Sequence, residues 1–244
     1  MLKIVIGDRN AELVHALKGV FEDYLDVEVA AGDYLELAGR FLPEAWVTPT
    51  NSRGSMSGGI DKAVAGHYAR SAVAIEPALQ FRIRTEHGGV LPIGRAVVID
   101  AQELLADAAF GVVRPRFLIA TPTMVGDRDD LRRTKNTARA IAAAFQAIYE
   151  ANGLAAGEDG EEDPAMTPDE VRRIKTVLMP GLGTGTGRVS PQIGAELMLT
   201  GYKLFRRGFF PRWEDLDAAL AEVLAESALP NAAAVAAISI DLPL

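Results

Sequence analysis

The chain has 244 residues, of which 49% are hydrophobic and 24% are charged, and its 25 basic and 33 acidic residues give a formal net charge of −8. This composition excludes a disordered chain, a collagen-like repeat and a disulfide-stapled miniprotein, and the length suffices for one large α/β domain or two small ones. The acidic balance argues against a nucleic acid partner, because sequence-independent binding to a phosphate backbone depends on clustered Lys and Arg. It leaves open the binding of one small anion, since backbone N–H groups can hold a phosphate.

The sequence lacks the residues that many metal and cofactor sites require. Cysteine is absent, and the three histidines (His15, His67 and His87) are scattered along the sequence. We therefore expect no metal site and no cofactor. The first residues lack the basic head and apolar run of a signal peptide, and no stretch approaches 18 apolar residues, so we expect a cytoplasmic protein with no membrane partner.

The first quarter of the chain alternates between strand and helix patterns. Residues 2–6 form a short apolar run that ends in Gly-Asp, and apolar residues then recur at helical spacing over 11–21. Further buried strands are indicated at 27–31 and at 45–48. This order predicts a layered α/β sheet.

The next segment has more strand-like features. Residues 81–84 alternate Phe-Arg-Ile-Arg, residues 87–89 provide a His-Gly-Gly turn, and a second apolar run follows at 96–99. Two such runs joined by a glycine turn indicate an antiparallel hairpin, so we expect a mixed sheet. Residues 117–120 form another buried strand, which ends at Thr-Pro.

The central part contains the strongest helical pattern of the sequence. Residues 134–151 place Thr137, Ile141, Phe145 and Ile148 on one face. An acidic stretch at 153–165 is typical of a solvated linker loop, and a Thr-Pro-Asp-Glu capping box follows at 167–170. We therefore expect the helix to be separated from the next element by an exposed acidic loop.

The last third contains one more core strand, at 177–179, and a glycine loop that leads into a helix of about 15 residues from Pro191. Residues 209–244 are predicted to hold a helix near 214–226. We expect one domain over 1–208, with 209–244 as a helical extension packed on it.

The glycine loop is the first segment that indicates chemistry. Residues 180–191 read Pro-Gly-Leu-Gly-Thr-Gly-Thr-Gly-Arg-Val-Ser-Pro, with glycine at alternate positions between a strand and a helix. Such a loop can bring backbone N–H groups and the positive end of a helix dipole around a diphosphate. It matches neither Walker A, which needs Lys-Ser/Thr where Arg188 and Val189 stand, nor the dinucleotide fingerprint, which opens a βαβ unit. The alternative is a plain flexible connection.

A second segment, residues 48–64, runs from the end of a strand through a small-residue loop into a helix that begins near Ile60. Asn51 offers both a hydrogen-bond donor and an acceptor, and Asp61 offers a carboxylate that could orient or deprotonate a water molecule. The structural alternatives are a turn residue for Asn51 and a dipole-stabilised acid in the first helical turn for Asp61.

Together these segments resemble the macrodomain family. Asn51 and Asp61 have the spacing of its first signature, which ends in Gly-Gly-hydrophobic-Asp, and the Leu-Gly-Thr-Gly-x-Gly loop resembles its second. Gly-Asp at 32–33 is similar to the family's Gly-Asp-Ile-Thr, and residues 94–97 are similar to the segment that opens one of its central strands. The matches occur in the family's order and cover roughly residues 27–205.

The resemblance implies a three-layer α/β/α fold around a mixed sheet, with an ADP-ribose cleft at the strand ends. In that cleft Asp33 would accept the adenine amino group, and Asn51 and Asp61 would assist the attack of water on the distal ribose. The complete set of implied ligand-binding residues is Asp33, Gly58, Gly59, Ile60, Leu182, Gly183, Thr184, Gly185, Thr186, Gly187 and Val189.

The chain also departs from the family pattern. An aromatic residue often precedes the proline of the second loop, where Ser190 stands here, and hydrolytic members often have a histidine at the position of Ala65. Our leading interpretation is a metal-independent macrodomain hydrolase that removes an ester-linked ADP-ribosyl group or an O-acetyl group. The alternatives are a non-catalytic ADP-ribose-binding module and a structural protein that keeps only the fold.

Overall fold

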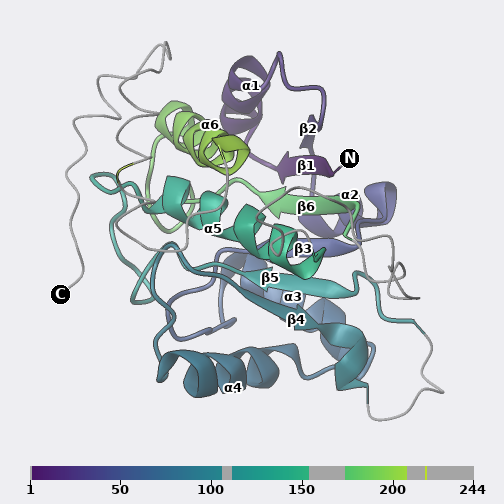
Figure 1. The fold of residues 1–244 in the computed structure, drawn as a ribbon. Coiled ribbons are helices and arrows are strands. Elements are labelled where there is room, and N and C mark those ends of the chain that lie inside the picture. Colours follow the sequence, from purple (N-terminus) through teal and green to yellow (C-terminus); the bar gives the residue numbers. More distant parts are fainter. Residues whose placement is uncertain (1, 106–111, 154–173, 208–217, 219–244) are drawn as a thin grey trace.

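The structure is a computed structural model that describes residues 2–105, 112–153, 174–207 and 218. The described residues form one six-stranded sheet with the strand order β2-β1-β6-β3-β5-β4 (Figure 1). The strands are β1 (Lys3–Asp8), β2 (Val27–Ala31), β3 (Ala45–Thr48), β4 (Val97–Asp100), β5 (Phe117–Ala120) and β6 (Thr176–Pro180). The helices are α1 (Ala11–Val20), α2 (Tyr34–Phe41), α3 (Gly59–Ala69), α4 (Ile75–His87), α5 (Asn136–Ala151) and α6 (Pro191–Arg207), with a short 3₁₀ helix at Ala101–Leu104.

The sheet is mixed, as the sequence predicts. Five strands are parallel to their neighbours, and only the edge strand β4 runs antiparallel, paired with β5. The carboxyl ends of β1, β6, β3 and β5 therefore lie along the same edge of the sheet. Any site built at this edge draws on four loops that are far apart in the sequence.

The predicted hairpin is wrong, because residues 81–84 belong to α4. The helix buries Ile75, Leu79 and Ile83, which recur every four residues, whereas Phe81 is 58% exposed. Four residues of apparent alternation are too short to outweigh this longer period. The second predicted strand of the hairpin is present as β4, although β4 is an edge strand and not a central one.

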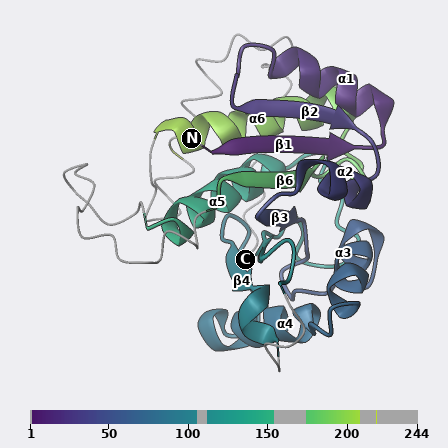
Figure 2. The same cartoon turned by 90° about the vertical axis from the view of Figure 1, so that its right-hand side faces the viewer.

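The side chains of each strand alternate between two cores. Ile4 and Ile6 face α1, α5 and α6, whereas Val5 between them faces α2, α3 and α4. Figure 2 shows the sheet between its two helical layers. The expected three-layer α/β/α architecture is thus confirmed.

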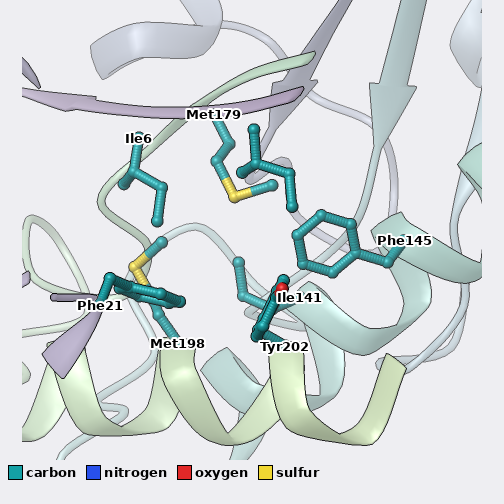
Figure 3. A pocket seen from close by; sticks show the side chains of 8 residues that line it. Ile6, Phe21, Ile141, Phe145, Met179, Met198 and Tyr202 are labelled. Atoms are coloured by element: carbon teal, nitrogen blue, oxygen red, sulfur yellow. The ribbon is translucent and has the colours of Figure 1, made fainter. Parts of the chain in front are cut away.

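The core under α1, α5 and α6 is tightly packed. In Figure 3, Phe21, Phe145 and Tyr202 converge with aliphatic and methionine side chains from β1, β6, α5 and α6. The gap between them leaves no room for a water molecule. This apolar region is therefore a packed interior and offers no ligand site.

Some predicted elements lie outside the described residues: the acidic linker 153–165 apart from Gly153, the capping box at 167–170, and the extension 209–244 apart from Ala218. Apart from the strand at 81–84, the remaining predicted strands and helices are present, and α6 is 17 residues long against the expected 15 or so. Among the described helices, none is both long enough and apolar enough to cross a membrane.

Candidate functional site

A cleft of about 660 Å³ lies at the carboxyl edge of the sheet. Its walls come from the loops that follow β1, β3, β5 and β6, each at the end of a parallel strand. This is the place where open α/β sheets bind ligands. The lining residues are Asp8, Asn10, Pro49, Thr50, Asn51, Ser55, Ser57, Gly58, Gly59, Ile60, Asp61, Thr123, Met124, Gly126, Asp127, Arg128, Pro180, Gly181, Gly183, Thr184, Gly185, Thr186 and Gly187.

The glycine loop forms one wall of the cleft. Its carbonyl groups are used internally: Gly183 O accepts from Val189 N at 3.1 Å, and Gly185 O accepts from Arg188 N at 3.1 Å. Within the described residues, none of the N–H groups of residues 183–187 donates a hydrogen bond. Because these residues line the cleft, their N–H groups are available to an anion.

Two glycines of this loop have different requirements. Gly183 has φ +78°, and a Cβ there would lie 2.3 Å from Thr137 Oγ1, so the position needs glycine for folding. A Cβ at Gly185 would meet no atom within 4 Å. The space beside Gly185 is therefore open.

Leu182 and Val189 are not brought into the cleft. Leu182 is 0% exposed and packs in the core under α1, α5 and α6, and Val189 is 3% exposed. Their side chains hold the ends of the loop in the protein interior. A ligand in the cleft would meet the backbone of residues 183–187 between them.

Asp61 lies in the first turn of α3 and lines the same cleft. Thr48 Oγ1, at the end of β3, donates a hydrogen bond to Asp61 Oδ1. The pKa of Asp61 is raised to about 6, chiefly by burial and also by the charge of Glu76, against the opposing effect of the Thr48 hydrogen bond. The carboxylate is therefore mostly ionised at neutral pH and can accept a proton.

Asn51 combines the two roles that the sequence leaves open. Its Oδ1 accepts from Arg53 N at 3.0 Å and from Ser55 N at 3.1 Å, which is the behaviour of a turn residue. Its Nδ2 donates to Asp127 Oδ1, and Asn51 also lines the cleft. The side-chain oxygen of Asn51 is thus already hydrogen-bonded to the backbone of its own loop. Only the amide nitrogen remains to bind a ligand.

Asp33 is not among the residues that line the cleft. It is the N-cap of α2, where its Oδ1 accepts from Leu35 N at 2.8 Å and Glu36 N at 3.3 Å, and its Oδ2 pairs with Arg9. Asp8, at the end of the neighbouring strand β1, lines the cleft instead.

The polar cleft residues that sequence reasoning missed include Asp8, Asn10, Asp127 and Arg128. Asp8 directly follows an apolar run that is correctly identified as a strand, so the carboxyl-end rule could have found it. The loop after β5 gives a weaker signal, because only the fold shows that it turns back over the glycine loop.

His67 does not reach the cleft. Its Nε2 lies 2.7 Å from Arg114 O, and its ring packs 4.7 Å from that of the buried Trp46. Across the described ranges, no group of three or more His, Asp or Glu side chains could hold a metal ion.

The chain is similar to several solved macrodomains. The macrodomain of Mycobacterium tuberculosis DarG is 19% identical with a TM-score of 0.49, and the match covers 71% of this chain and 88% of that one. An Oceanobacillus iheyensis macrodomain with ADP is 17% identical with a TM-score of 0.45, covering 75% and 84%. Thermosipho africanus DarTG in complex with ADP-ribose is 14% identical with a TM-score of 0.43, covering 81% and 49%. These values are too low to transfer any residue.

The sequence itself provides the decisive comparison. No curated protein matches the chain significantly. The family model of the Macro domain, however, matches residues 47–198, which is more than half of the chain. This range begins within β3 and ends within α6, and it contains Asn51, Asp61 and the glycine loop. The chain therefore belongs to the macro domain family.

Proposed function

We propose that this macro domain binds ADP-ribose in the cleft and hydrolyses the bond between the distal ribose and an adduct, either an ester-linked protein side chain or an O-acetyl group. The observation that carries the proposal is that one cleft is lined by both an anion-compatible glycine loop and the carboxylate of Asp61. The first feature suits a diphosphate, and the second suits an attack by water beside it.

The diphosphate would lie against residues 183–187. Their free N–H groups supply several donors, and the net charge of −8 is no obstacle because these donors belong to the backbone. Arg128 lines the same cleft and adds a positive side chain. A nucleoside diphosphate therefore fits this wall better than an uncharged sugar.

The adenine would lie at the β1 end of the cleft. Asp8 supports this orientation, because its carboxylate lines the cleft and could accept a hydrogen bond from the adenine amino group. Asp33 already caps α2 and pairs with Arg9. We therefore assign the adenine contact to Asp8 in place of Asp33.

The reaction would take place at the other end, beside Asp61. With an ester-linked protein side chain as substrate, the oxygen of a water molecule forms a bond to the anomeric carbon of the distal ribose, and the bond from this carbon to the ester oxygen breaks. The side-chain carboxylate leaves with the bonding pair, and the proton of the water passes to Asp61. Thr48 would hold Asp61 in place, and the Nδ2 group of Asn51 would donate to an oxygen of the sugar.

A calorimetric titration and a turnover assay test the proposal together. We expect ADP-ribose to bind in the micromolar range, about −8 kcal/mol. Asp61→Ala should lower turnover of an ester-linked ADP-ribosylated protein or of O-acetyl-ADP-ribose by about 10²–10⁴, as is typical for a positioned acid–base group. Its ADP-ribose affinity should change far less, because the glycine loop is intact.

The same two measurements separate the alternatives. Intact binding with background turnover in both the wild-type protein and Asp61→Ala would identify a non-catalytic ADP-ribose-binding module. Absence of binding to ADP-ribose would leave a protein that keeps only the fold.

A further inference from the structure

The oxygen of the Asn51 side chain is fully committed within the protein. Oδ1 accepts from the backbone N–H groups of Arg53 and Ser55, at 3.0 and 3.1 Å. A carbonyl oxygen has two lone pairs, so these bonds saturate it. They also identify which end of the amide is the oxygen, because a nitrogen there could not accept from an N–H group.

The nitrogen of the same amide is only half used. One of its two N–H groups donates to Asp127 Oδ1. The other donates to no residue in the described parts of the chain, and Asn51 lines the cleft. Towards a ligand, Asn51 is therefore a hydrogen-bond donor only.

We propose that Asp127 is a positioning residue for this donor: its carboxylate holds the amide of Asn51 so that the second N–H group meets an acceptor oxygen on the distal ribose or its adduct. The inference rests on the proposed function, since it assigns the distal sugar to this part of the cleft. The inference also restricts the chemistry of the ligand. The ligand atom beside Asn51 must be a hydrogen-bond acceptor, and a group that can only donate would not fit there.

Asp127 is exposed, but its loop is held by other bonds. Asp129 Oδ2 accepts from Gly126 N at 2.9 Å, and Met124 O accepts from Ser52 N at 2.9 Å. The second bond joins the Asp127 loop directly to the residue after Asn51. The carboxylate and the amide are therefore kept in register by hydrogen bonds that do not involve Asp127 itself.

Three variants test the proposal. Asp127→Ala removes the acceptor, Asp127→Asn keeps an acceptor oxygen but removes the charge, and Asp130→Ala removes a neighbouring exposed carboxylate that pairs with Arg132 and does not line the cleft. We expect Asp127→Ala to lower kcat about tenfold with KM within about twofold, because one hydrogen bond that orients a donor is lost while the diphosphate contacts remain. Asp127→Asn should retain kcat within about threefold, and Asp130→Ala should match the wild type.

A second readout does not depend on turnover. In ¹⁵N–¹H spectra, the Nδ2 proton of Asn51 that donates to Asp127 should lie downfield of its position in a solvated asparagine amide; the signals are assigned by their loss in Asn51→Ala. Asp127→Ala should move this proton upfield towards the solvated position, and ADP-ribose should shift the other proton in the wild-type protein.

The outcomes are distinct. Unchanged kcat and unchanged amide signals in Asp127→Ala would overturn the positioning role, and so would an equal loss of kcat in Asp127→Asn and Asp127→Ala. If the wild-type protein binds ADP-ribose without turning over any substrate, the hydrolase proposal fails. The amide signals then decide the role of Asp127 alone.

Discussion

The hydroxyl group of Thr48, the last residue of β3, donates a hydrogen bond to the carboxylate of Asp61, in the first turn of α3. Thr48 is fully buried, and it is the residue whose hydrogen bond limits the rise in the pKa of Asp61 that burial causes. The contact between the end of β3 and the start of α3 thereby influences the ionisation state of Asp61, the group that we propose as the base.

Removal of the Thr48 hydroxyl should change the pH dependence of turnover. A hydrogen bond to the ionised form of an acid lowers its pKa, so Thr48→Val should raise the pKa of Asp61 above its present value of about 6. The acidic limb of the kcat profile should then move to higher pH. Thr121→Val, at a second buried threonine that donates to Ala140 O outside the cleft, is the matched control. An unshifted limb in Thr48→Val would show that Asp61 is not the titrating base.

Asp61→Asn should stabilise the fold at neutral pH. The pKa of Asp61 in the folded protein, about 6, is above its ordinary value of 3.8, so its contribution to stability is present below pH 4 and is lost as the pH rises through 6. Asparagine avoids this loss, and the free energy of unfolding at pH 7.5 should rise by about 1–3 kcal/mol. Urea unfolding at pH 4 and pH 7.5 measures the difference, and equal effects of the substitution at both pH values would contradict the assignment.

Gly185→Val should abolish ADP-ribose binding without loss of stability. A Cβ added at this position meets no protein atom within 4 Å, so the valine side chain would occupy the cleft beside the free N–H groups. Calorimetry and thermal unfolding on the same sample give both quantities. Gly39→Val, at a helical glycine of α2 that also has open space and lies outside the cleft, should bind normally. Full affinity in Gly185→Val would make the loop a plain connection.

Asp8 and Asp33 should lose different properties when they are truncated. Asp8→Ala should weaken ADP-ribose binding by about 1–3 kcal/mol if the adenine amino group donates to it. Asp33→Ala should lower stability by about 0.5–2 kcal/mol, because it removes the N-cap of α2, and should leave affinity nearly unchanged. The reverse pattern in calorimetry would return the adenine contact to Asp33.

The sequence predicts the sheet well because its central strands are largely buried on both faces and read as short apolar runs, as in 117–120. It fails at α4, where the alternation of Phe81 and Ile83 with arginines imitates a strand. The helical period of Ile75, Leu79 and Ile83 becomes decisive only when the window extends beyond those four residues.

The site could be predicted where its residues are adjacent in the sequence. Gly58 to Asp61 and the glycine loop are contiguous motifs, and both line the cleft. Asp8 and Asp127 reach it only because parallel pairing brings the ends of β1 and β5 to the same edge. The capping role of Asp33 depends on where α2 begins, and sequence-based boundaries are uncertain by a few residues.

The cleft walls are joined before any ligand arrives. Leu131 N donates to Gly187 O at 2.9 Å, and Asn51 and Met124 form a β-bridge, so the loop after β5 is tied to the loops after β6 and β3. The conformational entropy of these three loops is therefore already lost when the chain folds. Binding should consequently show a small unfavourable entropy and a heat-capacity change no larger than that expected from the ligand surface it covers.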